Sequence, residues 1–166
     1  MVEARRRKQA KDAPLKGVRI LVVESGYYED IADTLLAGAR RMLDAAKASY
    51  DVVTVPGALE IPQAVVIALE AARGAKAYDG VVALGCVIRG ETSHYDIVAG
   101  ESARALMDIG VTRGVPVGNG ILTVDAPEQA HRRAGLEGGD KGGVAAAAAL
   151  ALVRLKRDRA SPRKRR

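Results

Sequence analysis

The sequence has few of the features that mark secreted or membrane proteins. Among its 166 residues there is one cysteine, Cys86, and there is no Phe or Trp. A single cysteine cannot form an internal disulfide, so we expect a reducing, cytoplasmic setting. The longest apolar run, residues 144–153, is too short to cross a membrane, and the charged N-terminus lacks the apolar segment of a secretory signal.

Sequence patterns of common cofactor and nucleophile sites are also missing. Cys86, His94 and His131 do not have metal-ligand spacing, and no glycine-rich dinucleotide fingerprint follows the first predicted strand. Ser93 adjoins His94, but adjacency in sequence is not the geometry of a nucleophilic triad. We therefore predict neither a catalytic metal nor a nicotinamide cofactor.

The net charge of +6 is divided unevenly along the chain. Residues 1–16 carry +4 and residues 154–166 carry +7, which leaves −5 for the body between them. We predict a basic tail over 1–16, one domain over 17–156 and a second basic tail over 157–166. Basic tails can bind RNA or an anionic surface. The acidic body and the scarcity of aromatic residues instead favour solvated tails and no nucleic-acid partner.

The spacing of the apolar residues predicts a chain in which strands alternate with helices. Strands are expected at 19–23, 50–55, 80–86 and within 115–124, the last interrupted around 118–120. Helices are expected at 29–48, 62–72, 93–109 and 141–156, and a further short helix opens at Pro127. This alternation predicts a three-layer α/β/α domain with a four-stranded parallel sheet.

Polar and special residues collect where these strands end. Tyr27 follows the first strand, residues 56–60 follow the second, residues 85–94 follow the third, and Asn119 lies within or near the end of the fourth. Parallel sheets bind ligands beyond the carboxyl ends of their strands. We therefore expect a binding site at this edge of the sheet.

The segment 85–94 is the most informative of these. It nearly matches a phosphate-binding P-loop, but Glu91 stands where the lysine must be, which argues against a nucleotide hydrolase. The amides of Glu91, Thr92 and Ser93 could still bind a single phosphate, and His94 beside them could transfer protons near neutral pH. The alternative is a capped helix start with a solvent-facing histidine.

Three further residues are candidates on weaker grounds. Glu60 could accept hydrogen bonds from a polyol, or it could simply complement the dipole of the helix that follows. Arg133 and Lys141 flank the glycine-rich loop 135–139 and could bind a phosphate. Among 26 basic residues, however, most are surface charges.

Together, these motifs resemble those of lumazine synthases over residues 18–155. The matching segments are 55–62 (VPGALEIP), 85–96 (GCVIRGETSHYD), 120–124 (GILTV), 128–133 (EQAHRR) and 141–142 (KG), in that order and spacing. The resemblance implies a flavodoxin-like fold and a transferase of riboflavin biosynthesis that needs no cofactor. Its small-molecule substrates would be 5-amino-6-(D-ribitylamino)uracil and 3,4-dihydroxy-2-butanone 4-phosphate, and its products 6,7-dimethyl-8-ribityllumazine, phosphate and water.

The resemblance also assigns roles to individual residues. It implies a ring-stacking Tyr27, a ribityl site at Ala58 and Glu60, and a heterocycle site at the backbone near Val87 and Ile88, with Leu59 and Cys86 as further substrate-binding residues. It also implies a phosphate site at Gly90, Glu91, Thr92 and Arg133 with Lys141 nearby, and a proton shuttle at His94. Asn119 occupies a position where many relatives have an aromatic residue. No metal is implied.

The resemblance further implies a homo-oligomer whose sites lie between the subunits of a pentamer. Asn119, Arg133 and Lys141 would come from the neighbouring subunit. Some members of the family build shells of sixty subunits from twelve pentamers, and association with riboflavin synthase is a further implied partnership. The loop 135–139 lacks the insertion that the resemblance links to free pentamers, which favours the shell. The basic C-terminal tail could equally obstruct the shell, so both assemblies stay open.

This chain departs from the commoner family pattern in one loop and one strand. Gly26 replaces a frequent arginine, Tyr28 follows Tyr27, and Asn119 makes the ring slot less apolar. These departures leave two alternatives open. One is a flavin- or lumazine-binding carrier with little turnover, and the other is a structural shell whose tails bind polyanions.

Overall fold

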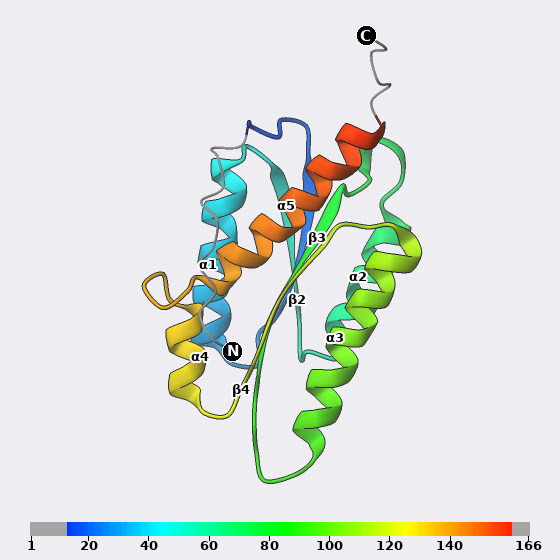
Figure 1. The fold of residues 1–166 in the computed structure, drawn as a ribbon. Coiled ribbons are helices and arrows are strands. Elements are labelled where there is room, and N and C mark those ends of the chain that lie inside the picture. The colour runs from blue at the N-terminus through cyan, green and yellow to red at the C-terminus, as the bar shows by residue number, and fades with distance from the viewer. Residues whose placement is uncertain (1–12, 161–166) are drawn as a thin grey trace.

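Four apolar segments form one parallel sheet at the centre of residues 13–160, the part of the chain that this computed structural model describes (Figure 1). The strands are β1 (Arg19–Ser25), β2 (Ser49–Val55), β3 (Gly80–Ile88) and β4 (Val117–Val124), in the order β2-β1-β3-β4. The central strands β1 and β3 are buried almost throughout, as expected when helices cover both faces. The predicted four-stranded parallel sheet is confirmed.

Helices cover the two faces of the sheet unequally. On one face lie α1 (Glu29–Ala45), α4 (Pro127–Ala134) and α5 (Lys141–Ala160); on the other lie α2 (Glu60–Ala71) and α3 (His94–Arg113). A short 3₁₀ helix, Gly74–Lys76, precedes β3. Side chains alternate along β1, so Ile20 and Val22 join the core under α1 and α5, whereas Leu21 and Val23 join the core under α2 and α3. This three-layer α/β/α arrangement is the predicted one.

The predicted interruption of the fourth strand is wrong. β4 pairs with β3 without a break from Val117 to Val124. Gly118 is needed because α5 passes directly over it: a Cβ atom there would lie 2.0 Å from the carbonyl oxygen of Ala145. The glycines of β4 therefore mark a close approach between helix and strand, which sequence alone cannot distinguish from a turn.

Several element ends also differ from the prediction. α1 ends at Ala45, just before Lys47 takes a left-handed φ of 56°. α3 continues to Arg113 and stops at Gly114, which has a φ of 60° and forms a left-handed helix C-cap. α5 includes residues 157–160, which were expected to belong to the basic tail. Residues 1–12 and 161–166 of the predicted tails lie outside the described residues.

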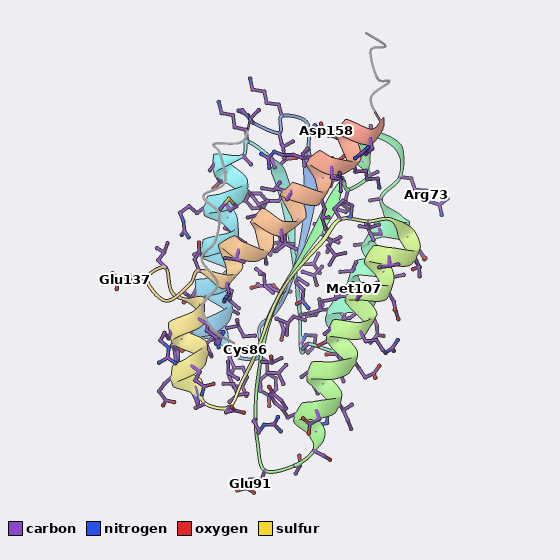
Figure 2. The ribbon with its side chains drawn as sticks, viewed as in Figure 1. Arg73, Cys86, Glu91, Met107, Glu137 and Asp158 are labelled. Carbon is purple, nitrogen blue, oxygen red and sulfur yellow. The ribbon has the colours of Figure 1, made fainter. Side chains whose placement is uncertain are left out.

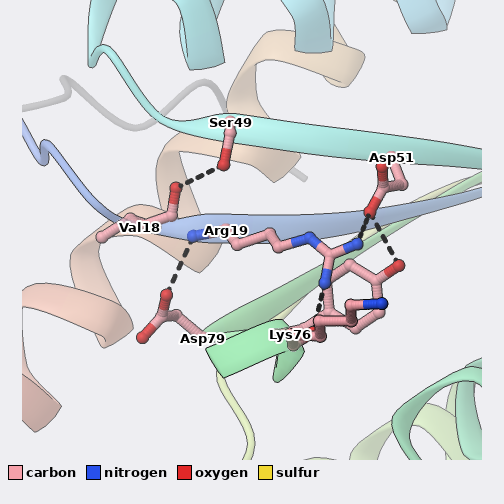
Figure 3. Close-up of polar contacts among 7 residues, drawn as sticks. Val18, Arg19, Ser49, Asp51, Lys76 and Asp79 are labelled. Atoms are coloured by element: carbon pink, nitrogen blue, oxygen red, sulfur yellow. Dashed lines mark hydrogen bonds and ion pairs between the residues drawn. The ribbon is translucent and has the colours of Figure 1, made fainter. Parts of the chain in front are cut away.

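Polar side chains at the amino end of the sheet bond one another (Figure 3). The Arg19 guanidinium lies 2.5 Å from a carboxylate oxygen of Asp51, and the hydroxyl of Tyr78 donates to the same oxygen over 2.8 Å. The Arg19 amide donates to Asp79 over 2.8 Å, and its guanidinium lies 4.4 Å from the centre of the Tyr78 ring. These contacts join β1 to β2 and to the segment that precedes β3.

Candidate active site

A cavity of about 350 Å³ opens at the carboxyl edge of the sheet. Four segments meet there, namely the loop after β1, the turn before α2, the end of β3 with the loop that follows it, and the start of α3. The predicted site residues that line the cavity are Tyr27, Ala58, Leu59, Glu60, Cys86, Val87, Ile88, Gly90, Thr92 and His94. The parallel topology thus brings together segments that are far apart in the sequence.

Four residues outside the predicted site also line this cavity: Tyr28, Gly57, Tyr95 and Val98. Tyr28 and Gly57 adjoin predicted residues. Tyr95 and Val98 belong to the first turns of α3. Val98 follows His94 by four residues and therefore shares its helix face, so helical spacing could have predicted it.

Two tyrosines form one wall of the cavity. The rings of Tyr27 and Tyr28 meet edge to face, with their centres 5.0 Å apart. Tyr27 is 72% exposed, so its ring can still stack on a ligand, whereas Tyr28 is half-buried against the core. Burial, with smaller contributions from Tyr27 and Cys86, raises the pKa of Tyr28. Its hydroxyl is therefore protonated at neutral pH and can donate a hydrogen bond.

Cys86 lies near the end of β3 (Figure 2), lines the cavity and is only 7% exposed. Burial, with a smaller contribution from Asp30, raises the pKa of its thiol to about 11. A thiol with this pKa is almost entirely protonated at neutral pH and is a poor nucleophile. Cys86 can therefore shape the cavity but is not suited to covalent chemistry.

The turn before α2 places a carboxylate at the cavity. The Glu60 amide donates to the carbonyl oxygen of Gly57 over 3.2 Å, which closes the turn. A Cβ atom on residue 57 would lie only 2.8 Å from the Glu60 carboxylate, so glycine lets the carboxylate fold back over the turn. Glu60 is exposed and lines the cavity, which leaves its oxygens able to accept hydrogen bonds from a ligand.

The loop between β3 and α3 exposes its backbone. Within the described chain, the amides of Gly90, Glu91 and Thr92 donate no hydrogen bond, and the side chain of Ser93, at the N-cap position, makes no capping bond. The His94 amide donates weakly to the Thr92 hydroxyl over 3.4 Å. Free amides at a helix N-terminus can bind an anion. The exposed His94 side chain lines the cavity directly beside them.

Four predicted site residues lie outside this cavity. Glu91 is at the exposed tip of the β3–α3 loop (Figure 2). Asn119 projects from β4 and lines a second cavity of about 500 Å³ between α3 and α5. Arg133 is exposed on α4, and Lys141 is half-buried at the first residue of α5, on the opposite face of the sheet from α3. A single chain therefore keeps Asn119, Arg133 and Lys141 away from the cavity, whereas Glu91 adjoins Gly90 and Thr92, which line it.

Residues 13–160 contain no group of three or more His, Cys, Asp or Glu side chains that could hold a metal ion. Over the same range, no helix is both long and apolar enough to span a membrane.

Comparison with known proteins decides the family. The sequence pattern of the 6,7-dimethyl-8-ribityllumazine synthase family matches residues 17–157, which is most of the chain. The chain belongs to the lumazine synthase family. The residues that line the cavity all fall within the matched range.

Individual lumazine synthases are similar over nearly their whole length. The 6,7-dimethyl-8-ribityllumazine synthase of Methylobacterium sp. is 64% identical over 95% of this chain and 88% of its own. That of Azorhizobium caulinodans is 59% identical over 95% of this chain and 98% of its own. The 6,7-dimethyl-8-ribityllumazine synthase 1 of Rhizobium meliloti is 60% identical over 87% of this chain and 95% of its own.

Proposed function

We propose that this protein is a transferase of riboflavin biosynthesis that forms 6,7-dimethyl-8-ribityllumazine. Its substrates are 5-amino-6-(D-ribitylamino)uracil and 3,4-dihydroxy-2-butanone 4-phosphate, and phosphate and water leave. Membership in the lumazine synthase family supports this reaction. The observation in this chain that carries it is that substrate-binding residues predicted from four separate segments line one cavity.

The groups in the cavity suit the two substrates. The exposed ring of Tyr27 can stack on the pyrimidine, and the Glu60 carboxylate can accept hydrogen bonds from the ribityl hydroxyls. The free amides of residues 90–92 can bind the phosphate of the ketone. The two reactants would then meet beside His94.

The reaction needs mainly positioning and proton transfer. The free amine of the pyrimidine attacks the ketone and forms an imine with loss of water. Phosphate is then eliminated, and the enol that this leaves tautomerises to a ketone. The ribitylamino nitrogen attacks that ketone and closes the second ring with loss of a second water. Holding both reactants in one cavity makes this bimolecular condensation effectively unimolecular. His94 is suited to moving the protons that these steps require, because its exposed imidazole lines the cavity and can both accept and donate a proton.

The complete site would lie between two subunits of a homopentamer. Three observations support this arrangement. Asn119, Arg133 and Lys141 lie away from the cavity within one chain. β4 is an edge strand of the sheet. The groove beside it exposes large apolar side chains, which a neighbouring subunit would cover: Met107, Val111, Leu152 and Leu155.

The proposal of a larger assembly rests on the family resemblance and on one loop. Twelve pentamers would form a sixty-subunit shell, which the short loop 135–139 permits. We place the protein in the cytoplasm, where riboflavin synthase would use its product and could associate with the shell. Light scattering that shows only pentamers would argue against the shell.

One assay tests the proposed reaction. Purified protein is mixed with both substrates, and lumazine absorbance is followed against the uncatalysed background. We expect clear acceleration that falls roughly 10- to 100-fold in Arg133→Ala, which corresponds to losing hydrogen bonds between charged groups. Arg132→Ala, the neighbouring exposed arginine on α4, is the matched control and should change little.

Two results would contradict the proposal. Background rates from a correctly assembled oligomer would show that the fold is kept and that the protein binds a lumazine or flavin without turnover. An equal loss of activity in Arg132→Ala and Arg133→Ala would mean that the rate depends on the positive charge of α4 in general, and that Arg133 does not form a specific phosphate site.

A further inference from the structure

Arg89 is the first residue of the loop that carries the exposed amides, and its side chain contacts other residues of the protein. Its Nε lies 3.1 Å from Asp125, which follows β4, and an Nη lies 3.3 Å from Asp96 in the first turn of α3. The guanidinium also lies 4.0 Å from the centre of the Tyr95 ring. One side chain therefore contacts the two segments that flank the loop in space.

The backbone at the two ends of this loop is fixed by hydrogen bonds. The Arg89 amide donates to the carbonyl oxygen of Val124 over 2.9 Å, and the Asp96 amide donates to that of Ser93 over 3.0 Å. Between these two bonds, the amides of residues 90–92 make none within the described chain. The Arg89 side chain spans this gap, because it starts at one end of the loop and bonds Asp96 just beyond the other.

A basic residue beside a phosphate-binding loop would ordinarily be taken for a phosphate ligand. Here two carboxylates face the guanidinium and neutralise it. The hydrogen bond that Arg89 donates to Asp96 is the largest cause that raises the pKa of Arg89. A guanidinium held by two aspartates and stacked on a ring is aimed at protein rather than at a ligand. Tyr95, on which it stacks, lines the cavity next to His94.

We infer that Arg89 is a positioning residue that fixes the 90–93 loop, Tyr95 and His94 for the phosphorylated substrate, without binding the phosphate itself. This inference rests on the proposed function for its kinetic consequences. It depends on the planar fork of arginine, because a lysine is a point charge that cannot bond both aspartates and stack flat on Tyr95.

The experiment compares the wild type with Arg89→Ala, Arg89→Lys and the control Arg104→Ala. Arg104 pairs with Glu101 and Asp108, all on α3, so it makes similar ion pairs without reaching the loop. Turnover is measured with each substrate varied in turn, and hydrogen exchange is measured at the hydrogen-bonded amides of Arg89 and Asp96.

In Arg89→Ala we expect kcat/KM for the phosphorylated ketone to fall roughly 10- to 100-fold, as for a misplaced catalytic group, with a smaller rise in KM for the pyrimidine. Exchange at the two amides should become faster. Arg89→Lys should resemble Arg89→Ala, because charge without the fork does not hold the loop. Arg104→Ala should match the wild type in both measurements.

Two outcomes would overturn the inference. Full rescue by Arg89→Lys would make Arg89 a charge that acts on the phosphate. Unchanged exchange at both amides in Arg89→Ala, with turnover reduced, would show that the loop does not depend on it. If the wild type itself fails to turn over, the proposed function fails instead, and the exchange measurements still decide whether Arg89 holds the loop.

Discussion

At the amino end of the sheet, polar groups bond one another, whereas at the carboxyl end many of them stay open. Arg19, Asp51, Tyr78 and Asp79 form one connected set of contacts between β1, β2 and the start of β3. At the other end, the amides of residues 90–92 have no partner in the described chain, and the ring of Tyr27 is largely exposed. Both ends are rich in polar residues, so their number does not identify the site.

The two ends differ in whether their polar groups remain available to bind a ligand. A donor and an acceptor that bond each other stabilise the fold and have little left for a ligand. Open amides and an uncovered ring remain available for binding. We therefore propose that the carboxyl end is the functional end, where the ion pairs of Arg89 hold the open groups in position.

The largest expected effect is the slow chemical labelling of Cys86. A reactive thiol there would be a further open group at the carboxyl end and would contradict the comparison. Burial raises its pKa from 9.0 to about 11, so the thiolate at pH 8 is roughly 100-fold scarcer than for an ordinary thiol. We expect iodoacetamide to label the native protein at least about 100-fold more slowly than the urea-unfolded chain, with the rate rising as the pH approaches 11. Mass spectrometry at timed intervals measures both rates, and equal rates would show that Cys86 is open.

His94 tests the comparison through the catalytic activity of the carboxyl end. It is exposed and lines the cavity, so His94→Ala should lower kcat/KM by about 10²-fold, the lower end for general acid–base catalysis. Because the side chain is exposed, the midpoint of unfolding should not change. His131→Ala, which removes the other histidine of the chain and its contact with Asp30, should leave kcat/KM near the wild-type value. Complete loss of activity in a correctly assembled His94→Ala oligomer would contradict the view that positioning supplies most of the rate.

Much of this arrangement follows from sequence, and the exceptions have physical causes. The alternation of strands and helices predicts the sheet, and the position of the loops after each strand predicts which residues meet at the cavity. The interruption predicted in β4 is wrong because Gly118 serves the close passage of α5, a contact that exists only in three dimensions. Val98 was missed although its spacing from His94 places both on one helix face.

The residues that sequence could not place are those that depend on contacts across the fold. Nothing near Arg89 in the sequence indicates that Asp125 will lie against it, because the two are brought together by the pairing of β3 with β4. Likewise, the sequence nominates Asn119, Arg133 and Lys141 as site residues, but one chain keeps them away from the cavity. Whether a neighbouring subunit supplies them is a property of the assembly.

Arg19 tests the amino end, where we expect stability to change and activity to stay the same. Arg19→Ala removes an ion pair that links β1 to β2 and the contact with the Tyr78 ring, at a cost of about 1 kcal/mol in the free energy of unfolding. Arg104→Ala is the control, because its ion pairs lie within one exposed helix face, where solvent screens them, and should change the stability less than Arg19→Ala does. Urea unfolding at a fixed protein concentration measures both, since assembly couples stability to concentration. A fall in kcat in Arg19→Ala would show that the two ends are not separate.

Asp51 gives the smallest expected effect and tests the same cluster through pH. The hydrogen bond from Tyr78, and then the Arg19 guanidinium, lower the pKa of Asp51 below its ordinary value near 3.9. Its contribution to stability is therefore complete above about pH 4, and it is lost as the pH falls through the lower, folded-state pKa. Because the carboxylate is half exposed, solvent screening keeps this contribution well under about 1 kcal/mol. Circular dichroism measures the unfolding midpoint of the wild type and of Asp51→Asn between about pH 5 and pH 2. As the pH is lowered, the midpoint of Asp51→Asn should fall less steeply than that of the wild type. If the midpoints of the two proteins fall in parallel with pH, these contacts do not lower the pKa of Asp51. Pairing at the amino end would then contribute less to stability than its geometry suggests.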